Sequence, residues 1–333
     1  MLAYFQRLTP RYRRSWALVV AYLAFLLLIS LLDFGTNTAG QTIFRGLLLS
    51  MLIFLVASGL SLIFGLLDVL NFAQGAFLLV GAYVGYATYK SVELSSTLSF
   101  LAAVGAAVVS VGVLGAIVEA GLIRPLYERP VFQIVLTFGL GAVLLDLVER
   151  IWGVQPNQPL APPELFSGTF YLFGQSLSVY RLFIIALGLI IMIAVGLLLN
   201  RTRLGIIIRA GVQDAEMVQA LGINVRRVFT FVFVLGAVLA GLGGIALVPY
   251  QGATLDMGGQ FLILAIVVVV IGGMGSYEGT AIASFIVGLT RAVAEQMSLK
   301  HFDAPVLAET SILLLMIVVL LVQPSGLFGR EES

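Results

Sequence analysis

The 333-residue chain contains no cysteine and a single histidine. The missing thiols exclude disulfides and thiolate metal sites, and one imidazole leaves almost no capacity for histidine chemistry. Charged residues make up only 11% of the chain, against about 25% in ordinary soluble domains, whereas hydrophobic residues make up 60%. So few charges cannot cover the surface of a soluble fold, which excludes a soluble enzyme. A net charge of +1 likewise excludes a nucleic-acid-binding protein, which needs a basic face.

Long apolar segments are abundant, and a bilayer core of about 30 Å needs roughly 20 apolar residues per helix. Ten segments are candidates, although the eighth is shorter than a full span. We therefore predict an all-α polytopic membrane protein with about ten (eight to ten) transmembrane helices. The segments are Trp16–Leu32, Gly46–Leu66, Phe72–Tyr89, Leu98–Val118, Val131–Ile151, Val179–Asn200, Val228–Val248, Phe261–Ile271, Ala281–Met297 and Val306–Val322.

Basic residues predict the orientation of these spans, because Lys and Arg accumulate in cytoplasmic loops. With ten spans, twelve basic residues lie on one side of the membrane and five on the other. This excess places both termini in the cytoplasm. The longest cytoplasmic loop then covers residues 201–227, and the outer loop near 152–178 carries four prolines, which suit a rigid surface.

The long inner loop contains a segment that can form a short helix. This helix would begin after Asp214, a capping residue, and end at Gly222. Met217, Val218 and Leu221 would share one of its faces. The residues alone leave three interpretations open: a helix lying on anionic lipid, a simple topology signal, and a helix that docks in a groove of a partner protein.

A polar group occurs where the second and third apolar segments meet. Asp68, Asn71 and Gln74 are spaced at i, i+3 and i+6, roughly one face of a helix, and Gly75 follows them. Transporters build binding sites at broken helices near the midplane, so these residues are candidates for the lining of a substrate path. Asn and Gln also form hydrogen bonds between membrane helices, so a packing role is equally open.

The remaining ionisable and small residues are expected to be structural. Asp146 with Arg150, and Arg291 with Glu295, are spaced at i, i+4 and predict two ion pairs. Glu119 lies near an inner boundary, where we expect it to be solvated. Close helix packing is expected at a late glycine set: Gly272, Gly273, Gly275 and Gly279.

Four stretches, in their order along the chain, resemble the branched-chain (hydrophobic) amino acid permeases of ABC importers. The second half of the inner loop reads RAGVQDAEMVQALGINVRR, and the first stretch contains the family's N-F-A-x-G element as NFAQG. That family often has His where this chain has Gln74, which puts a proton-linked role there in doubt. The four stretches are Gly59–Tyr86, Ile123–Pro130, Arg209–Gly244 and Val269–Gly288.

The resemblance implies one permease domain over residues 1–333, with broken helices around a central path, in the inner membrane of a bacterium or in an archaeal cell membrane. It also implies a second homologous permease subunit, two cytoplasmic ATPases and an extracytoplasmic solute-binding protein. No cofactor is expected, and the chain has no G-x-x-x-x-G-K-[ST] phosphate loop of its own. Under this resemblance the inner loop couples to the ATPases through Asp214, Glu216, Met217, Leu221 and Gly222.

We therefore expect a non-enzymatic subunit that forms half of a translocation pathway for branched-chain or other hydrophobic amino acids. An importer of urea, short amides or small carboxylates is the alternative within the same class. A stand-alone secondary transporter or channel would need ionisable residues at the midplane, in which this chain is poor. An intramembrane enzyme would need a catalytic constellation such as Ser/His or paired Asp, which one loop histidine does not support.

Overall fold

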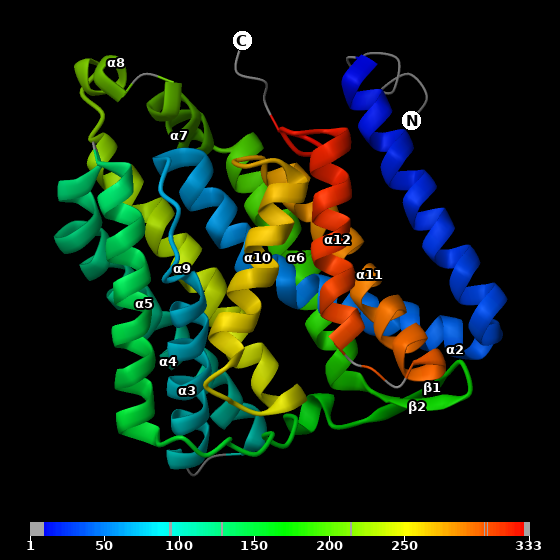
Figure 1. Ribbon diagram of the computed structural model, residues 1–333. Coiled ribbons are helices and arrows are strands. Elements are labelled where there is room, and N and C mark those ends of the chain that lie inside the picture. Colours follow the sequence, from blue (N-terminus) through cyan, green and yellow to red (C-terminus); the bar gives the residue numbers. More distant parts are fainter. Residues whose placement is uncertain are drawn as a thin grey trace.

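The computed structural model describes residues 10–92, 95–127, 129–213, 215–302, 304 and 306–329, with the backbone alone for 10–13, 212–213 and 215–216. Helices dominate the described chain (Figure 1). Every one of the ten predicted apolar segments overlaps a helix, and the last coincides with α12. The helices and strands are α2 Pro10–Leu67, α3 Gln74–Ser91, α4 Ser96–Val118, η1 Glu119–Ile123, η2 Arg124–Leu126, α5 Pro130–Trp152, η3 Glu164–Phe166, β1 Thr169–Leu172, β2 Gln175–Ser178, α6 Val179–Arg201, α7 Arg203–Gln213, α8 Ala215–Ala220, α9 Val225–Gln251, α10 Met257–Gly272, α11 Tyr277–His301 and α12 Val306–Val322.

Helix α2 consists of two helical segments joined at a break. Gly35 has φ 76° and ψ 168°, a conformation outside the helical region that residues with a Cβ rarely adopt. The N-terminal part of α2 runs along one side of the molecule, and the chain then turns back through its centre (Figure 1). The first two predicted spans therefore both lie within α2, one on each side of Gly35.

The number of membrane-spanning helices is lower than predicted when judged by length and hydropathy. Among the described residues, five helices are long and apolar enough to cross a membrane, with α2 counted once. The count rises to six if α10 and α11, which meet at a bend of 119°, form one broken span. The prediction of eight to ten spans is therefore not confirmed, whereas the all-α membrane architecture is.

Two helices form the centre of the bundle. The most apolar windows of α2 and α9 are 83% and 72% buried, whereas those of α4, α5 and α6 are only 28%, 22% and 17% buried. The outer helices expose large apolar side chains such as Phe132, Phe138 and Ile190. Apolar exposure on this scale fits a surface that faces lipid or another apolar subunit.

Glycines allow the central helices to approach closely. A Cβ atom on Gly81 of α3 would lie 2.5 Å from the Cα atom of Gly241 in α9. At the bend between α10 and α11, a Cβ atom on Gly272 would lie 2.5 Å from the carbonyl carbon of Gly279. The predicted packing role of the late glycines is therefore confirmed for this pair, because any side chain there would separate the two backbones.

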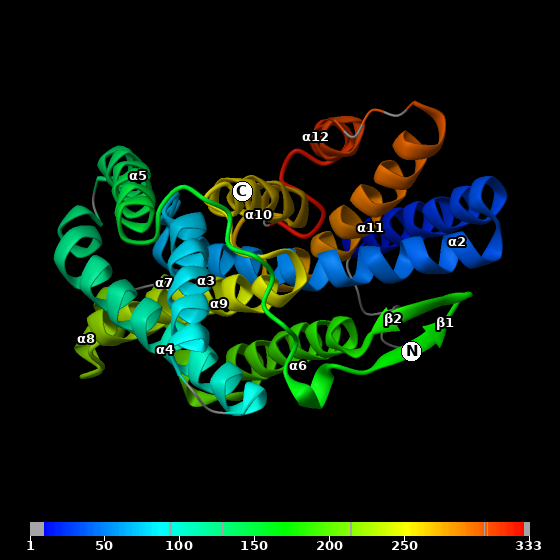
Figure 2. The same cartoon turned by 90° about the horizontal axis from the view of Figure 1, so that it is seen from below.

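The loop predicted to be outer contains a short hairpin, which lies at the opposite end of the molecule from α7 and α8 (Figures 1 and 2). Its strands β1 and β2 are antiparallel, with Leu172 opposite Gln175. The two turn residues, Phe173 and Gly174, have φ 50° and 76°, as a type I′ turn requires. The carbonyl oxygen of Phe173 accepts a hydrogen bond of 2.9 Å from Nε2 of Gln41, which ties the hairpin to α2.

Candidate functional site

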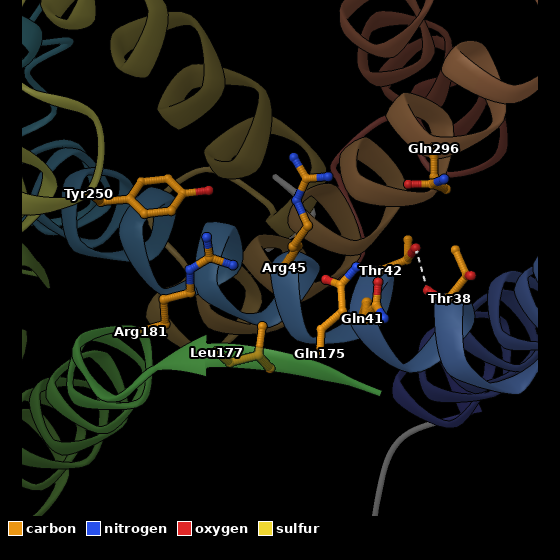
Figure 3. Close-up of a pocket in the computed structure, with 9 residues that line it drawn as sticks. All are labelled: Thr38, Gln41, Thr42, Arg45, Gln175, Leu177, Arg181, Tyr250 and Gln296. Carbon is orange, nitrogen blue, oxygen red and sulfur yellow. Dashed lines mark hydrogen bonds between the residues drawn. The ribbon is translucent and has the colours of Figure 1, made fainter. Parts of the chain in front are cut away.

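A polar pocket of about 500 Å³ lies between α2, β2, α6, α9 and α11 (Figure 3). Such a volume falls within the range of small-molecule sites. The lining is unusually polar for a chain that is 60% hydrophobic, since Leu177 is the one aliphatic side chain among the nine. The lining residues are Thr38, Gln41, Thr42, Arg45, Gln175, Leu177, Arg181, Tyr250 and Gln296.

Local periodicity explains how two of these elements present their side chains to the pocket. The four α2 residues are spaced at i, i+3, i+4 and i+7, which places them on one helix face. Gln175 and Leu177 are two residues apart on β2, and a strand turns such residues to the same side. The remaining three side chains come from α6, α9 and α11 and reach the same space only through tertiary packing.

Two guanidinium groups dominate the charge of the pocket. Nη2 of Arg45 lies 2.9 Å from Oε1 of Glu295 on α11, so this charge is neutralised. The guanidinium of Arg181 lies over the ring of Tyr250, 5.4 Å from its centroid, in a cation–π contact. Within the described part of the chain, Arg181 has no carboxylate partner.

Of the two ion pairs predicted from i, i+4 spacing, the structure corrects one and confirms the other. The predicted pair of Arg291 with Glu295 is wrong, because Glu295 contacts Arg45 and Arg291 lies 3.9 Å from Glu309 of α12. Spacing along one helix permits such a pair but does not exclude a closer partner on a neighbouring helix. The exposed pair of Asp146 and Arg150 is confirmed at 2.7 Å.

The sequence alone does not predict this pocket, since Arg45 and Arg181 count there only among the five basic residues of the outer side. One signal was present: the polar stripe formed by Thr38, Gln41, Thr42 and Arg45 has helical spacing within otherwise apolar sequence. None of the residues predicted to line the substrate path lies at this pocket.

Asn71 and Gln74 lie instead in the centre of the bundle, and both are fully buried. Nε2 of Gln74 donates to the carbonyl oxygens of Val56 in α2, at 3.3 Å, and Gly236 in α9, at 2.9 Å. Nδ2 of Asn71 donates to Oε1 of Gln74 at 3.3 Å. These bonds join three helices, as expected from a packing role; a substrate-path role stays a prediction. A Cβ atom on the neighbouring Gly75 would lie 2.2 Å from a carbonyl oxygen of α10.

The connection between α2 and α3, residues 68–73, is non-helical, as a broken helix requires. Asp68 begins it with φ 52° and is exposed. The freed backbone groups find partners: Oδ1 of Asn71 accepts from the N–H of Ala73 at 3.1 Å, and Oγ1 of Thr137 accepts from the N–H of Phe72 at 3.2 Å. Thr137, on α5, was not recognised from the sequence. Its hydroxyl provides the hydrogen bond that water would otherwise make to this backbone group inside the bundle.

The inner loop contains the expected short helix, α8, which ends at Ala220. The N–H of Gly222 donates to Gln219 at 2.9 Å and that of Ile223 donates to Val218 at 3.3 Å, which is the Schellman pattern. Gly222 has φ 82°, so the predicted glycine terminus of the helix is confirmed. Asp214, the predicted cap, lies outside the described residues, as does the side chain of Glu216.

The face of α8 divides into a buried part and an exposed part. Val218 is 3% exposed and anchors the helix to the rest of the protein. Met217 of α8 and Leu221, the residue that follows its last residue, are 61% and 73% exposed. Two large exposed apolar side chains at a short helix and its C-terminal end form a surface suited to a partner groove or to the lipid interface.

A buried polar cluster lies at the same end of the molecule, beside the start of α9. Glu119 is fully buried, which corrects the expectation that it is solvated. Arg124 contacts both of its oxygens, at 2.8 and 3.2 Å, and the hydroxyls of Tyr127 and Thr230 each donate to it at 2.7 Å. Burial and the bond to Glu119 raise the pKa of Tyr127, which therefore remains a donor. The cluster ties the end of α4 to the helix that follows the inner loop.

Known proteins match this chain over most of its length. Residues 42–322 match the family described as branched-chain amino acid transport system / permease component. The high-affinity branched-chain amino acid transport system permease proteins LivH of Escherichia coli K12 and BraD of Pseudomonas aeruginosa are each 28% identical, over 88% of this chain and 96% of theirs. A probable branched-chain amino acid transport permease protein LivH of Methanocaldococcus jannaschii is 28% identical over 85% of this chain and 90% of its own. Since the matched residues cover far more than half of the sequence, the chain belongs to the family of branched-chain amino acid transport permease components.

Proposed function

We propose that this protein forms half of the translocation pathway of an ATP-driven importer for branched-chain or other hydrophobic amino acids. The names of the three relatives, all branched-chain amino acid transport permeases, support this substrate class. Residues 1–333 act as one permease domain in a bacterial or archaeal cell membrane. Its partners are a second homologous permease, two cytoplasmic ATPases that hydrolyse ATP, and an extracytoplasmic solute-binding protein.

In this arrangement the end that carries α7 and α8 is cytoplasmic, together with both termini. The excess of basic residues in the inner loops supports this orientation. The hairpin and the polar pocket then lie on the extracytoplasmic side, since the hairpin is at the opposite end of the molecule (Figure 1). A solute arriving from outside would meet the pocket before it reached the centre of the bundle.

Helix α8 is the proposed contact with an ATPase subunit, and the exposure of Met217 and Leu221 is the observation that carries this proposal. A second pocket, of about 820 Å³, lies beside it and is lined in part by Gln219, Arg226 and Phe229. A protein partner can fill this pocket and bury Met217 and Leu221 at the same time. Binding to a lipid surface would instead depend mainly on the flanking arginines.

The residues Asp68, Asn71, Gln74 and Gly75 are proposed to border the substrate path at the non-helical connection between α2 and α3. The hydrogen bonds of Gln74 to α2 and α9 support a role in the opening of this path, because a change in the distance between these helices would have to break the bonds. Opening of the path and loss of these bonds would then be one event.

Substitution of the exposed apolar residues tests the coupling proposal. We expect Met217→Asp and Leu221→Asp to abolish substrate-stimulated ATP hydrolysis by the reconstituted complex, because each places a charge in an apolar contact. The matched controls are Arg203→Gln and Arg227→Gln, which remove charge from the same loop without lining this second pocket and should retain most of the stimulation. If the arginine variants lose stimulation and the apolar variants keep it, α8 lies on lipid and the proposed ATPase contact is wrong.

A further inference from the structure

We infer that the polar pocket beside the hairpin binds the carboxylate group of the transported solute, and that the guanidinium of Arg181 is its partner. This inference rests on the proposed function, because it assigns the recognition of an amino acid to one site. A carboxylate is the anion that any α-amino acid carries at neutral pH, whatever its side chain. A site that binds this carboxylate would therefore accept every amino acid of the substrate class.

The pocket carries a positive charge that no carboxylate of the described chain neutralises, which favours an anionic ligand. Arg45 is paired with Glu295, whereas Arg181 contacts only the face of Tyr250 and has no carboxylate partner among the described residues. Arginine remains protonated at any physiological pH, and its planar fork matches a carboxylate with two parallel hydrogen bonds. The cation–π contact orients the guanidinium without using its in-plane N–H donors.

The side chains around Arg181 leave hydrogen-bonding groups available for a small polar ligand. Figure 3 shows the guanidinium groups of Arg45 and Arg181 extending into the same space, with the hydroxyl of Tyr250 directed toward it. In the described structure, the side chains of Gln175 and Gln296 and the hydroxyl of Tyr250 make no hydrogen bond within the chain. The amide oxygens of Gln175 and Gln296 are suitable acceptors for the ammonium group of the same solute.

The shape of the pocket favours a small solute over a side chain of a partner protein. Its volume of about 500 Å³ accommodates an amino acid with some water. Strand β2 lies along one edge of the pocket and turns Gln175 and Leu177 toward it (Figure 3).

Chemical protection of Arg181 in the assembled wild-type complex tests the inference directly. Phenylglyoxal modifies accessible guanidinium groups, and mass spectrometry reports the rate at each arginine. We expect leucine to slow the modification of Arg181 severalfold, and leucinamide, which lacks the carboxylate, to leave the rate unchanged. Arg150 is the internal control, because its side chain is 74% exposed on α5 and is not at the pocket.

Variants give an independent measurement. Loss of a charged hydrogen-bond partner should raise the leucine concentration for half-maximal transport by Arg181→Gln about tenfold. Arg181→Lys, which keeps the charge but not the fork, should fall between this variant and the wild type. Arg150→Gln removes the same charge from an exposed ion pair and should leave the concentration unchanged.

The outcomes separate this inference from the proposed function. Leucine transport by the wild-type complex with no protection of Arg181 overturns the carboxylate site and leaves the proposed function standing. Protection by leucine or acetate in a complex that does not transport leucine overturns the proposed function and keeps the carboxylate site. Protection by the solute-binding protein without solute shows that a protein side chain enters the pocket, which also overturns the inference.

Discussion

At the scale of single residues, the buried polar groups decide how the helices meet. Glu119 and Gln74 are both fully buried, and each makes hydrogen bonds to partners on other elements. Burial without such partners would cost several kcal/mol, so each residue specifies which neighbours its helix must have. The two differ in reach: Glu119 organises the end beside the inner loop, whereas Gln74 joins α2, α3 and α9 at the centre.

Replacement of Gln74 by leucine separates packing from transport. Gln74→Leu leaves the carbonyl oxygens of Val56 and Gly236 without this donor, so we expect the folded complex to lose about 1–3 kcal/mol of stability. If the path proposal is correct, transport per assembled complex also falls. Thermal unfolding in detergent and leucine uptake in proteoliposomes measure the two effects. Unchanged uptake by the assembled variant would assign Gln74 to packing alone. The control is Gln133→Leu on α5, which removes another buried amide side chain.

At the scale of elements, the loop helix α8 and the broken helix α2 depend on glycines with positive φ. Gly222 ends α8 at φ 82°, and Gly35 breaks α2 at φ 76°. Each glycine changes the direction of the chain. Gly222 turns the chain away from the exposed face of α8, and Gly35 returns α2 through the centre of the bundle (Figure 1). These positions therefore matter through backbone geometry and not through side-chain contacts, since neither has a neighbour within 4 Å of an added Cβ atom.

Gly222→Val tests whether α8 must keep its terminus to act. A β-branched residue at this φ costs roughly 1–2 kcal/mol, so we expect the helix end to unravel. Hydrogen exchange at residues 217–223 should rise, and stimulation of ATP hydrolysis should fall with it. Gly139→Val is the control, because that glycine has no neighbour within 4 Å and no positive φ. Retained stimulation together with faster exchange would show that an intact α8 is not needed for coupling.

At the scale of the whole molecule, the distribution of burial indicates how the protein sits in its surroundings. The central helices α2 and α9 are enclosed, and α4, α5 and α6 present apolar faces outward. Lipid covers such faces on a membrane protein, and the second permease subunit of the proposed complex would cover part of them. The hairpin lies at one end of the molecule, and α7 and α8 lie at the other (Figures 1 and 2). Strand β2 of the hairpin borders the polar pocket, and the Glu119 cluster adjoins the start of α9, which follows the inner loop.

Single-cysteine labelling tests the orientation, and the absence of native cysteine removes the background. We expect a membrane-impermeant maleimide to label Tyr171→Cys, at the exposed hairpin, from outside intact cells. Gln219→Cys and cysteines placed at either terminus should react only after the cells are permeabilised, because the excess of basic residues predicts that the inner loops and both termini are cytoplasmic. Labelling of either terminus from outside would contradict the predicted topology, in which both termini are cytoplasmic.

The sequence by itself determined the features that depend on neighbours along the chain. Apolar segments located the helices, because each helix satisfies its own backbone within the segment, and the spacing of Gly222 marked the end of α8. Tertiary structure alone decided which distant groups meet. Glu295 has a possible partner four residues away, yet its closest cation is Arg45, 250 residues distant in the sequence, because α2 packs against α11. The polar pocket depends on five separate elements, so no local pattern could place Arg181 beside Tyr250.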